Sequence, residues 1–153
     1  MITLYNLELN DIKLPVLIKE KEIEYKSKPL SQPDRIVELC NKALHLNQLA
    51  EEHVIALAVD TKCNALGLFR VSHGCVDSAL CNPREIFIRA LLVGASRVVV
   101  VHNHPSGNCE PSFEDMETKR RIEEAGNLIG IKMDDFIIIG GNSFYSFYEN
   151  EMM

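Results

Sequence analysis

Two histidines, a serine and an aspartate within fourteen residues carry the clearest chemical signal in this sequence. His102 and His104 lie two positions apart, so on an extended backbone both imidazoles point to the same side and can reach one ion. Asp115 can add a carboxylate oxygen. Two imidazoles and one carboxylate, with a fourth position left for water, favour a catalytic Zn²⁺ site, and Fe²⁺ is the weaker alternative for the same ligands.

The elements on either side of these residues are predicted to bring them together. Arg97–Val101 is a short β-branched run and is expected to be a buried strand that ends at His102. A proline and a glycine then impose a turn. Ser112 is expected to cap a helix over 113–128, which puts Asp115 in the first helical turn with its carboxylate directed back over the loop.

A water activated by zinc also needs a general base and a donor for the developing oxyanion. Ser112 is placed to be that donor, although capping the helix is sufficient reason for a serine there. Glu51 and Glu52 directly precede an apolar run at 53–60, expected to be a buried strand, and both are candidates for the base. A solvent-exposed position at the strand edge is the simpler interpretation of either glutamate taken alone.

Other titratable residues are interpreted as structural. His45, His53 and His73 have no comparable neighbours in the sequence, which indicates structural or surface positions. Asp134-Asp135 is predicted to be a turn rather than a pair of ligands. Lys119–Arg121 forms a small basic patch, which is more typical of a helix surface than of a nucleic-acid contact.

Composition bounds the function classes. The chain has 153 residues, of which 46% are hydrophobic and 25% charged, as expected for one globular core. No apolar run approaches the roughly 20 residues of a membrane helix, and no secretory signal is visible. The net charge of −6 argues against a large non-specific nucleic-acid surface but allows a local basic patch. Five scattered cysteines without a CxxC pair favour a reducing cytoplasm.

The hydrophobic patterns predict an α/β domain with a β-rich beginning. Two N-terminal strands are expected, joined by a polar turn at Lys19–Lys21. Strands and helices then alternate, with a proline opening each of the first two helices. The expected strands are 14–18, 22–26, 53–60, 66–73, 97–101, 131–133, 136–139 and 144–148, and the expected helices are 33–46, 83–94 and 113–128.

The block from His102 to Asp115 resembles the JAMM motif, His-x-His-Pro-x-Gly-x-x-x-Pro-Ser-x-x-Asp, of the JAB/MPN metalloprotease superfamily. More narrowly, the chain resembles the RadC-like branch over about residues 31–147. Further matches to that branch are Asn82-Pro83-Arg84-Glu85-Ile86-Phe87, Ala90, Thr118 and Gly130-Ile131 leading into Asp134-Asp135. The branch often has Asp-His at the last pair, so this chain departs from it there.

The resemblance implies a single-domain α/β/α sandwich with a mixed sheet, similar to the cytidine deaminase core. Residues 31–153 would form the RadC-like JAB/MPN domain. Residues 1–30 would be an N-terminal β-hairpin extension, in place of the helix-hairpin-helix region of longer members of the branch.

The resemblance also implies a set of roles. Zinc would be held by His102, His104 and Asp115, and Ser112 would stabilise the oxyanion. The family's glutamate lies eight residues before the aspartate that ends the first core strand, and with Asp60 as that aspartate the base is Glu52 rather than Glu51. The implied reaction is hydrolysis of a peptide or isopeptide bond in a peptide or protein substrate.

Two other functions stay open at the level of sequence. One is a nucleic-acid-associated or DNA-repair role, which a positive groove beside the motif would favour. The other is a metal-binding scaffold without catalysis, which loss of a motif residue would favour, whereas every motif position is present. The substrate would be selected by loops, of which 74–82 and 108–111 are the candidates.

Overall fold

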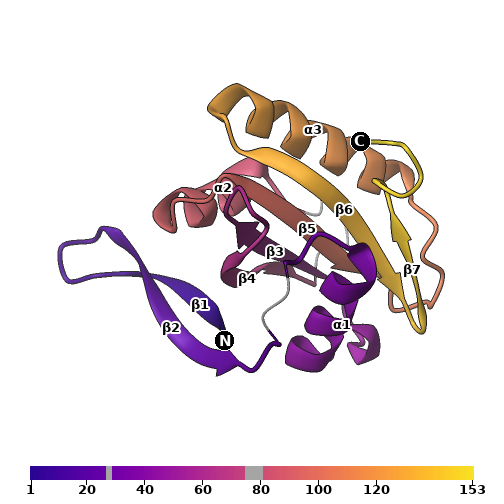
Figure 1. Cartoon of the computed structure of the whole chain (residues 1–153), viewed down its shortest axis with the longest axis horizontal. Helices are drawn as coiled ribbons and strands as arrows, with labels where there is room; N and C mark the ends of the chain where they lie inside the picture. The colour runs from indigo at the N-terminus through magenta and orange to yellow at the C-terminus, as the bar shows by residue number, and fades with distance from the viewer. Residues whose placement is uncertain (27–28, 75–80) are drawn as a thin grey trace.

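The computed structural model describes residues 1–26, 29–74 and 81–153 and confirms the expected α/β fold with a mixed sheet. Seven strands in the described ranges form one sheet in the order β2-β1-β4-β3-β5-β6-β7 (Figure 1). The strands are β1 (Ile2–Leu9), β2 (Pro15–Ile23), β3 (His53–Val59), β4 (Ala65–His73), β5 (Arg97–Asn103), β6 (Lys132–Gly140) and β7 (Ser143–Ser146). The helices are α1 (Pro33–Leu44), a 3₁₀ turn at Leu46–Gln48, α2 (Pro83–Leu92) and α3 (Phe113–Ile129).

The middle of the sheet is buried on both faces. In β5, Val99 packs in one apolar cluster with residues of α1, whereas Val98 and Val100 pack in a second cluster with residues of α2 and α3. Helix α1 therefore covers one face of the sheet, and α2 and α3 cover the other (Figure 1). Burial on both faces explains why β3 and β5 are continuous apolar runs without alternation.

The three helices were predicted, with ends that differ by at most two residues from those observed. Helix α1 begins at Pro33, the proline expected to open it, after Gln32. A capping box of Asn82 and Glu85 opens α2, and Ser112 opens α3 as predicted. No helix in the described ranges is long and apolar enough to cross a membrane.

Of the predicted N-terminal strands, 14–18 lies almost entirely in β2, whereas the turn expected at Lys19–Lys21 and the separate strand expected at 22–26 are wrong. The turn lies at 10–14, where Asn10 Oδ1 accepts the N–H groups of Ile12 and Leu14, and Lys19–Lys21 lies inside β2. β1 was not predicted, although Leu4 is fully buried and pairs with Leu68 of β4. β2 is an edge strand with one open side, and charged residues are common on such strands, so a run of charges did not mark a turn.

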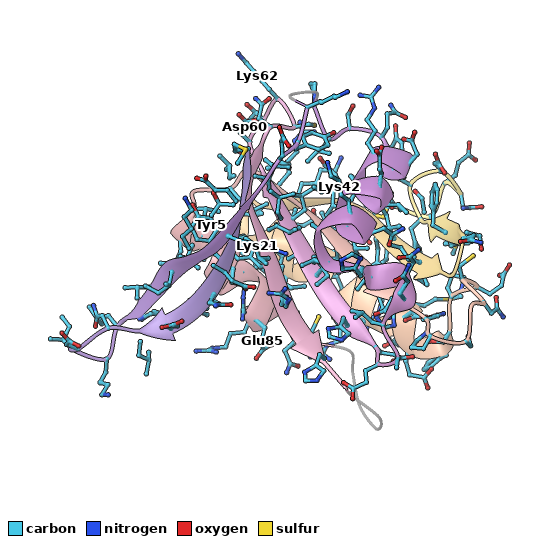
Figure 2. The ribbon with its side chains drawn as sticks, turned by 90° about the horizontal axis from the view of Figure 1, so that it is seen from below. Tyr5, Lys21, Lys42, Asp60, Lys62 and Glu85 are labelled. Atoms are coloured by element: carbon cyan, nitrogen blue, oxygen red, sulfur yellow. The ribbon has the colours of Figure 1, made fainter. Side chains whose placement is uncertain are left out.

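The hairpin of β1 and β2 is attached to the body of the molecule beside the end of α1. Lys21 Nζ donates to the carbonyl of Ala43 at 2.8 Å, and Lys42 Nζ to that of Glu24 at 3.4 Å. Figure 2 shows Lys21 and Lys42 on the hairpin and on α1, respectively. Lys21 thereby meets a carbonyl at the negative end of the α1 dipole, whereas Lys42 links α1 to the backbone that follows β2.

The strands predicted at 131–133 and 136–139 are parts of one continuous strand, β6, so the turn expected between them at Asp134-Asp135 is wrong. The register between β5 and β6 shifts where Val98 and Val99 face Met133 and Asp135, as in a bulge. The bulge lets two consecutive acidic residues remain in a strand. Asp134 contacts Arg97, and Asp135 is buried and accepts hydrogen bonds from Ser146 Oγ and the Tyr148 N–H.

Asp135 is predicted to make stability depend on pH. Burial raises the pKa of its carboxyl from 3.8 to about 6, so the folded chain holds the proton more tightly than the unfolded chain. The free energy of unfolding contributed by this group is therefore largest below pH 4 and falls as pH rises through 6. Between pH 5 and pH 7 the wild type should lose about 1 kcal/mol relative to Asp135→Asn. Urea unfolding of both proteins at the two pH values measures this difference, and equal changes would contradict it.

Candidate metal centre

The two motif histidines lie on extended backbone at the end of β5. The strand continues two residues further than predicted, so His102 is inside it and pairs with Val54 of β3 and Ile138 of β6. The His104 N–H donates to the Ile139 carbonyl at 2.8 Å, which holds it beside β6. The imidazole centroids are 4.9 Å apart. The central strand therefore brings both rings to one place, as their spacing predicted.

Each imidazole is oriented by a backbone carbonyl. His102 Nδ1 lies 3.0 Å from the His53 carbonyl, and His104 Nδ1 lies 2.8 Å from the Asn108 carbonyl. A carbonyl only accepts hydrogen bonds, so Nδ1 carries the hydrogen on both rings. In the neutral rings that tautomer leaves each Nε2 atom with a lone pair, as in histidines that bind metals, and a proton taken up at His104 Nε2 is donated to Asp115.

Asp115 faces both Nε2 atoms. One carboxylate oxygen lies 3.6 Å from His102 Nε2 and the other 3.2 Å from His104 Nε2. The side chain is 1% exposed. A reciprocal capping box fixes it, because the Ser112 N–H donates to Oδ2 at 2.7 Å and Ser112 Oγ accepts from the Asp115 N–H at 3.1 Å. Ser112 thus caps α3 and also holds this carboxylate beside the histidines.

Of the two candidate bases, Glu52 faces the histidines and Glu51 does not. Glu52 Oε2 is 3.9 Å from His102 Nε2. A carboxylate oxygen of Glu52 and one nitrogen from each of the two histidines all lie within 4.8 Å of one another. Glu51 instead contacts His73 at 2.9 Å. Two carboxylates therefore flank the imidazoles, and Glu52 is the more accessible, with 40% of its side chain exposed.

The electrostatics of this cluster suit a cation. Burial lowers the pKa of His102, while a hydrogen bond with Asp115 raises the pKa of His104. Burial alone would raise the pKa of Asp115, but hydrogen bonds from His104 and Ser112 outweigh it and hold the pKa below the usual value. His102 Nε2 is buried without a hydrogen-bond partner among the described residues. A neutral, orphaned nitrogen beside an ionised carboxylate fits a metal ion.

The histidines outside the motif and the basic residues of α3 lie only partly where the sequence predicted. The His53 and His73 rings stack at 5.0 Å beside the cluster, and the His53 carbonyl orients a predicted ligand. Within the expected basic patch, Arg120 pairs with two glutamates and Arg121 donates to the Asn82 side chain. Lys119 was expected on the surface but is buried, with its Nζ bonded to a glutamate and to a backbone carbonyl.

One buried polar residue at the site was not predicted. Asn103 is 1% exposed, and its amide bonds to the backbone of Glu51 and His53. Its position between two predicted ligands was the only signal in the sequence. The pairing of β5 with the residues before β3 is not visible there.

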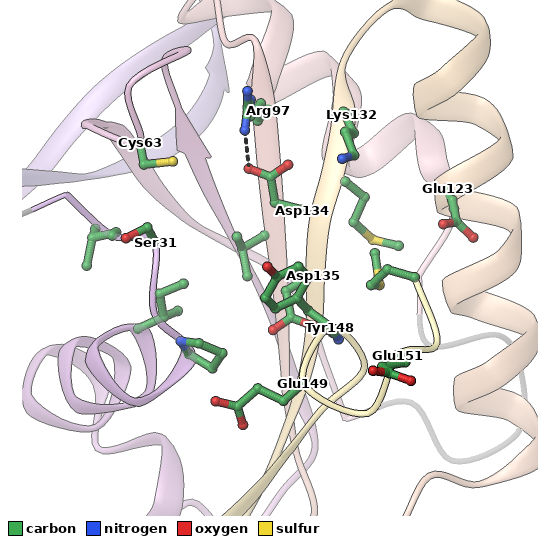
Figure 3. Close-up of a pocket in the computed structure, with 16 residues that line it drawn as sticks. Ser31, Cys63, Arg97, Glu123, Lys132, Asp134, Asp135, Tyr148, Glu149 and Glu151 are labelled. Atoms are coloured by element: carbon green, nitrogen blue, oxygen red, sulfur yellow. Dashed lines mark hydrogen bonds and ion pairs between the residues drawn. The ribbon is translucent and has the colours of Figure 1, made fainter.

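The motif lies away from a pocket of about 870 Å³ near the start of β5 and β6. Arg97, Lys132, Asp134 and Asp135 are among the residues lining this pocket (Figure 3). The histidines are at the opposite end of β5. The candidate metal centre is therefore a separate site. Of the two expected specificity loops, residues 75–80 lie outside the described ranges, whereas 108–111 adjoins His104.

Residues 30–152 match the family model described as the RadC-like JAB domain. The chain belongs to this family. The resemblance drawn from the JAMM motif is thereby confirmed.

Several bacterial relatives are similar to this RadC-like JAB domain, and each carries the name UPF0758 protein. The chain is 42% identical to the one from Geotalea uraniireducens over 67% of its own length and 45% of the relative. It is 36% identical to the one from Alkaliphilus metalliredigens, with 81% and 53% covered. For Thermotoga maritima the identity is 33%, with 84% and 57% covered. The chain spans about half the length of these relatives.

The motif loop of this RadC-like JAB domain rests against a glycine of β6. A Cβ added to Gly140 would lie 2.6 Å from the Gly107 carbonyl oxygen and 2.7 Å from the Cys109 nitrogen. The residue between them, Asn108, supplies the carbonyl that orients His104. Absence of a side chain at position 140 therefore sets the position of the loop that holds one of the predicted ligands.

Gly140→Ala is expected to weaken any metal binding at this site by about tenfold, since displacing a group that orients a ligand typically costs about 10–100-fold in metal affinity. Competition with a chromogenic chelator measures the affinity. Gly126→Ala is the matched control, because its Cβ would lie 2.4 Å from the Ile131 carbonyl oxygen and 3.0 Å from Phe87. That variant should lose thermal stability but keep the metal affinity of the wild type. Equal affinities in both variants would contradict the role given to Gly140.

Proposed function

We propose that this chain is a zinc-dependent metallohydrolase that cleaves a peptide or isopeptide bond. The observation that carries the proposal is the meeting of two oriented imidazoles with two carboxylates, one buried and one accessible. The family also supports it, because the chain matches the JAB domain over residues 30–152. The names of the relatives specify no reaction, so the chemistry is argued from the residues.

We assign His102, His104 and Asp115 as the zinc ligands. Both histidines present Nε2, and the Asp115 carboxylate is buried and fixed by the Ser112 N–H. Zinc bound by such a set would polarise a carbonyl group and lower the pKa of a water to about 7. Two nitrogens and one oxygen with an open fourth position are typical of catalytic zinc sites.

Glu52 and Ser112 carry the remaining steps in this proposal. Glu52 is accessible enough to exchange protons, so it accepts a proton from the attacking water and passes it to the leaving amine. Ser112 Oγ accepts the Asp115 N–H, which leaves its own hydroxyl hydrogen available. That hydrogen donates to the oxyanion formed from the substrate carbonyl.

The substrate proposed is a peptide or protein, and the compartment proposed is the reducing cytoplasm. An odd number of cysteines without a CxxC pair favours a reducing compartment. The arginines of the basic patch on α3 have partners within the chain, and the net charge is −6, so no observation favours nucleic acid as the substrate. A catalytically inactive scaffold is an outcome of the experiments below.

Metal content tests the ligand assignment. Purified wild-type protein should hold about one zinc per chain by elemental analysis. His104→Ala and Asp115→Asn should lose it, because two remaining ligands hold zinc weakly, whereas Glu52→Gln, with all three ligands, should still hold about one zinc per chain when zinc is supplied in excess. No metal in the wild type after supply of zinc at neutral pH would overturn the proposal. Loss in Glu52→Gln but not in Asp115→Asn would exchange the roles of the two carboxylates.

Hydrolysis tests the base. With zinc content matched, Glu52→Gln should cleave linear peptides or lysine-linked isopeptides about 10²–10⁴-fold more slowly than the wild type, because an amide cannot accept the proton. Glu51→Gln is the control, since Glu51 contacts His73 and should be dispensable. Full activity of Glu52→Gln would remove its role as base. No cleavage of either bond type by zinc-loaded wild type would favour the scaffold.

A further inference from the structure

We propose that Asn103 is a positioning residue that holds Glu52 beside the metal centre by fixing the backbone on both sides of it. The inference rests on the proposed function, in which Glu52 acts next to zinc. Asn103 itself stays away from the metal, because both ends of its amide bond to backbone groups.

The contacts bracket Glu52 directly. Asn103 Nδ2 donates to the Glu51 carbonyl at 3.0 Å, and Asn103 Oδ1 accepts the His53 N–H at 2.6 Å. One side chain on β5 therefore binds the residue before Glu52 and the residue after it. Because Asn103 is 1% exposed, little water is available to replace either bond.

Two further hydrogen bonds hold the backbone of residues 52 and 53. The His53 carbonyl accepts from His102 Nδ1, and the Glu52 carbonyl accepts the Gly74 N–H at 2.8 Å. Residues 51–53 are thus attached to β5 by two consecutive motif side chains. With the backbone held in this way, Glu52 Oε2 lies 3.9 Å from His102 Nε2.

Asparagine suits position 103 because its side chain both donates and accepts hydrogen bonds. The amide offers a donor and an acceptor on one short side chain, and the Glu51 carbonyl and His53 N–H need one of each. An ionised aspartate offers no donor, and a leucine of similar size offers neither. Glu52 precedes β3 rather than lying in it, so these bonds supply the anchoring that the sheet does not.

Zinc affinity in a double-mutant cycle tests the inference without a known substrate. Glu52→Gln should weaken binding about tenfold, because it removes a negative charge a few ångströms from a divalent cation. Asn103→Leu should weaken binding about three- to tenfold by letting that charge move away. The double variant should bind no more weakly than Glu52→Gln alone, because Asn103 acts through Glu52. Asn103→Ala serves in its place if the leucine variant does not fold, as judged by thermal melting of the metal-free protein.

Asn41→Leu is the matched control, because the Asn41 side chain also accepts a backbone N–H, that of Asn47. This variant should leave zinc affinity unchanged. Additive losses in the double variant, or unchanged affinity in both Asn103 variants, would overturn the positioning role and leave the proposed function intact. Unchanged affinity in Glu52→Gln would remove Glu52 from the metal's surroundings and overturn the inference. Absence of zinc binding in the wild type would overturn the proposed function itself.

Discussion

The antiparallel pairing of β3 with β5 is the constraint on which the site depends. Val54 faces His102 in this register, so the residues that precede β3 lie beside the residues that end β5. The ladder is held by apolar side chains buried on both faces of the sheet. A shift of one residue would turn every side chain of β5 to the other face, so the core that stabilises the sheet also fixes the site.

The cluster couples burial to charge. Asp115 is buried yet ionised because a helix N-terminus and His104 stabilise its negative charge. His102 is buried and neutral, with its Nδ1 taken by a carbonyl. An anion and two imidazole lone pairs converge at one place, so the electrostatic potential there is negative. The same low exposure that makes this arrangement costly without a cation strengthens its attraction for one.

Sequence reasoning succeeded where short-range rules apply. The three helices, the strands from β3 to β5, and the convergence of His102, His104 and Asp115 followed from apolar period, capping residues and spacing. It failed in β1, β2 and β6, which lie outside the three central strands. Charges at Lys19–Lys21 and Asp134-Asp135 indicated turns, but an exposed edge strand and a bulge accommodate them within strands. Such features depend on which strand lies alongside, and periodicity carries no such information.

By itself the sequence determined which residues could do chemistry, because residue types and local spacing are properties of adjacent residues. The His-x-His pair on a strand and an aspartate in the first turn of a capped helix form a set of candidate metal ligands before any sheet order is known. Only the tertiary structure showed that Glu52 faces the histidines and Glu51 does not, and only it revealed the contacts of Asn103. The position of Glu52 and the contacts of Asn103 both depend on residues about fifty positions apart that meet where two strands lie side by side. That contact is set by strand register and core packing, which act at long range along the chain.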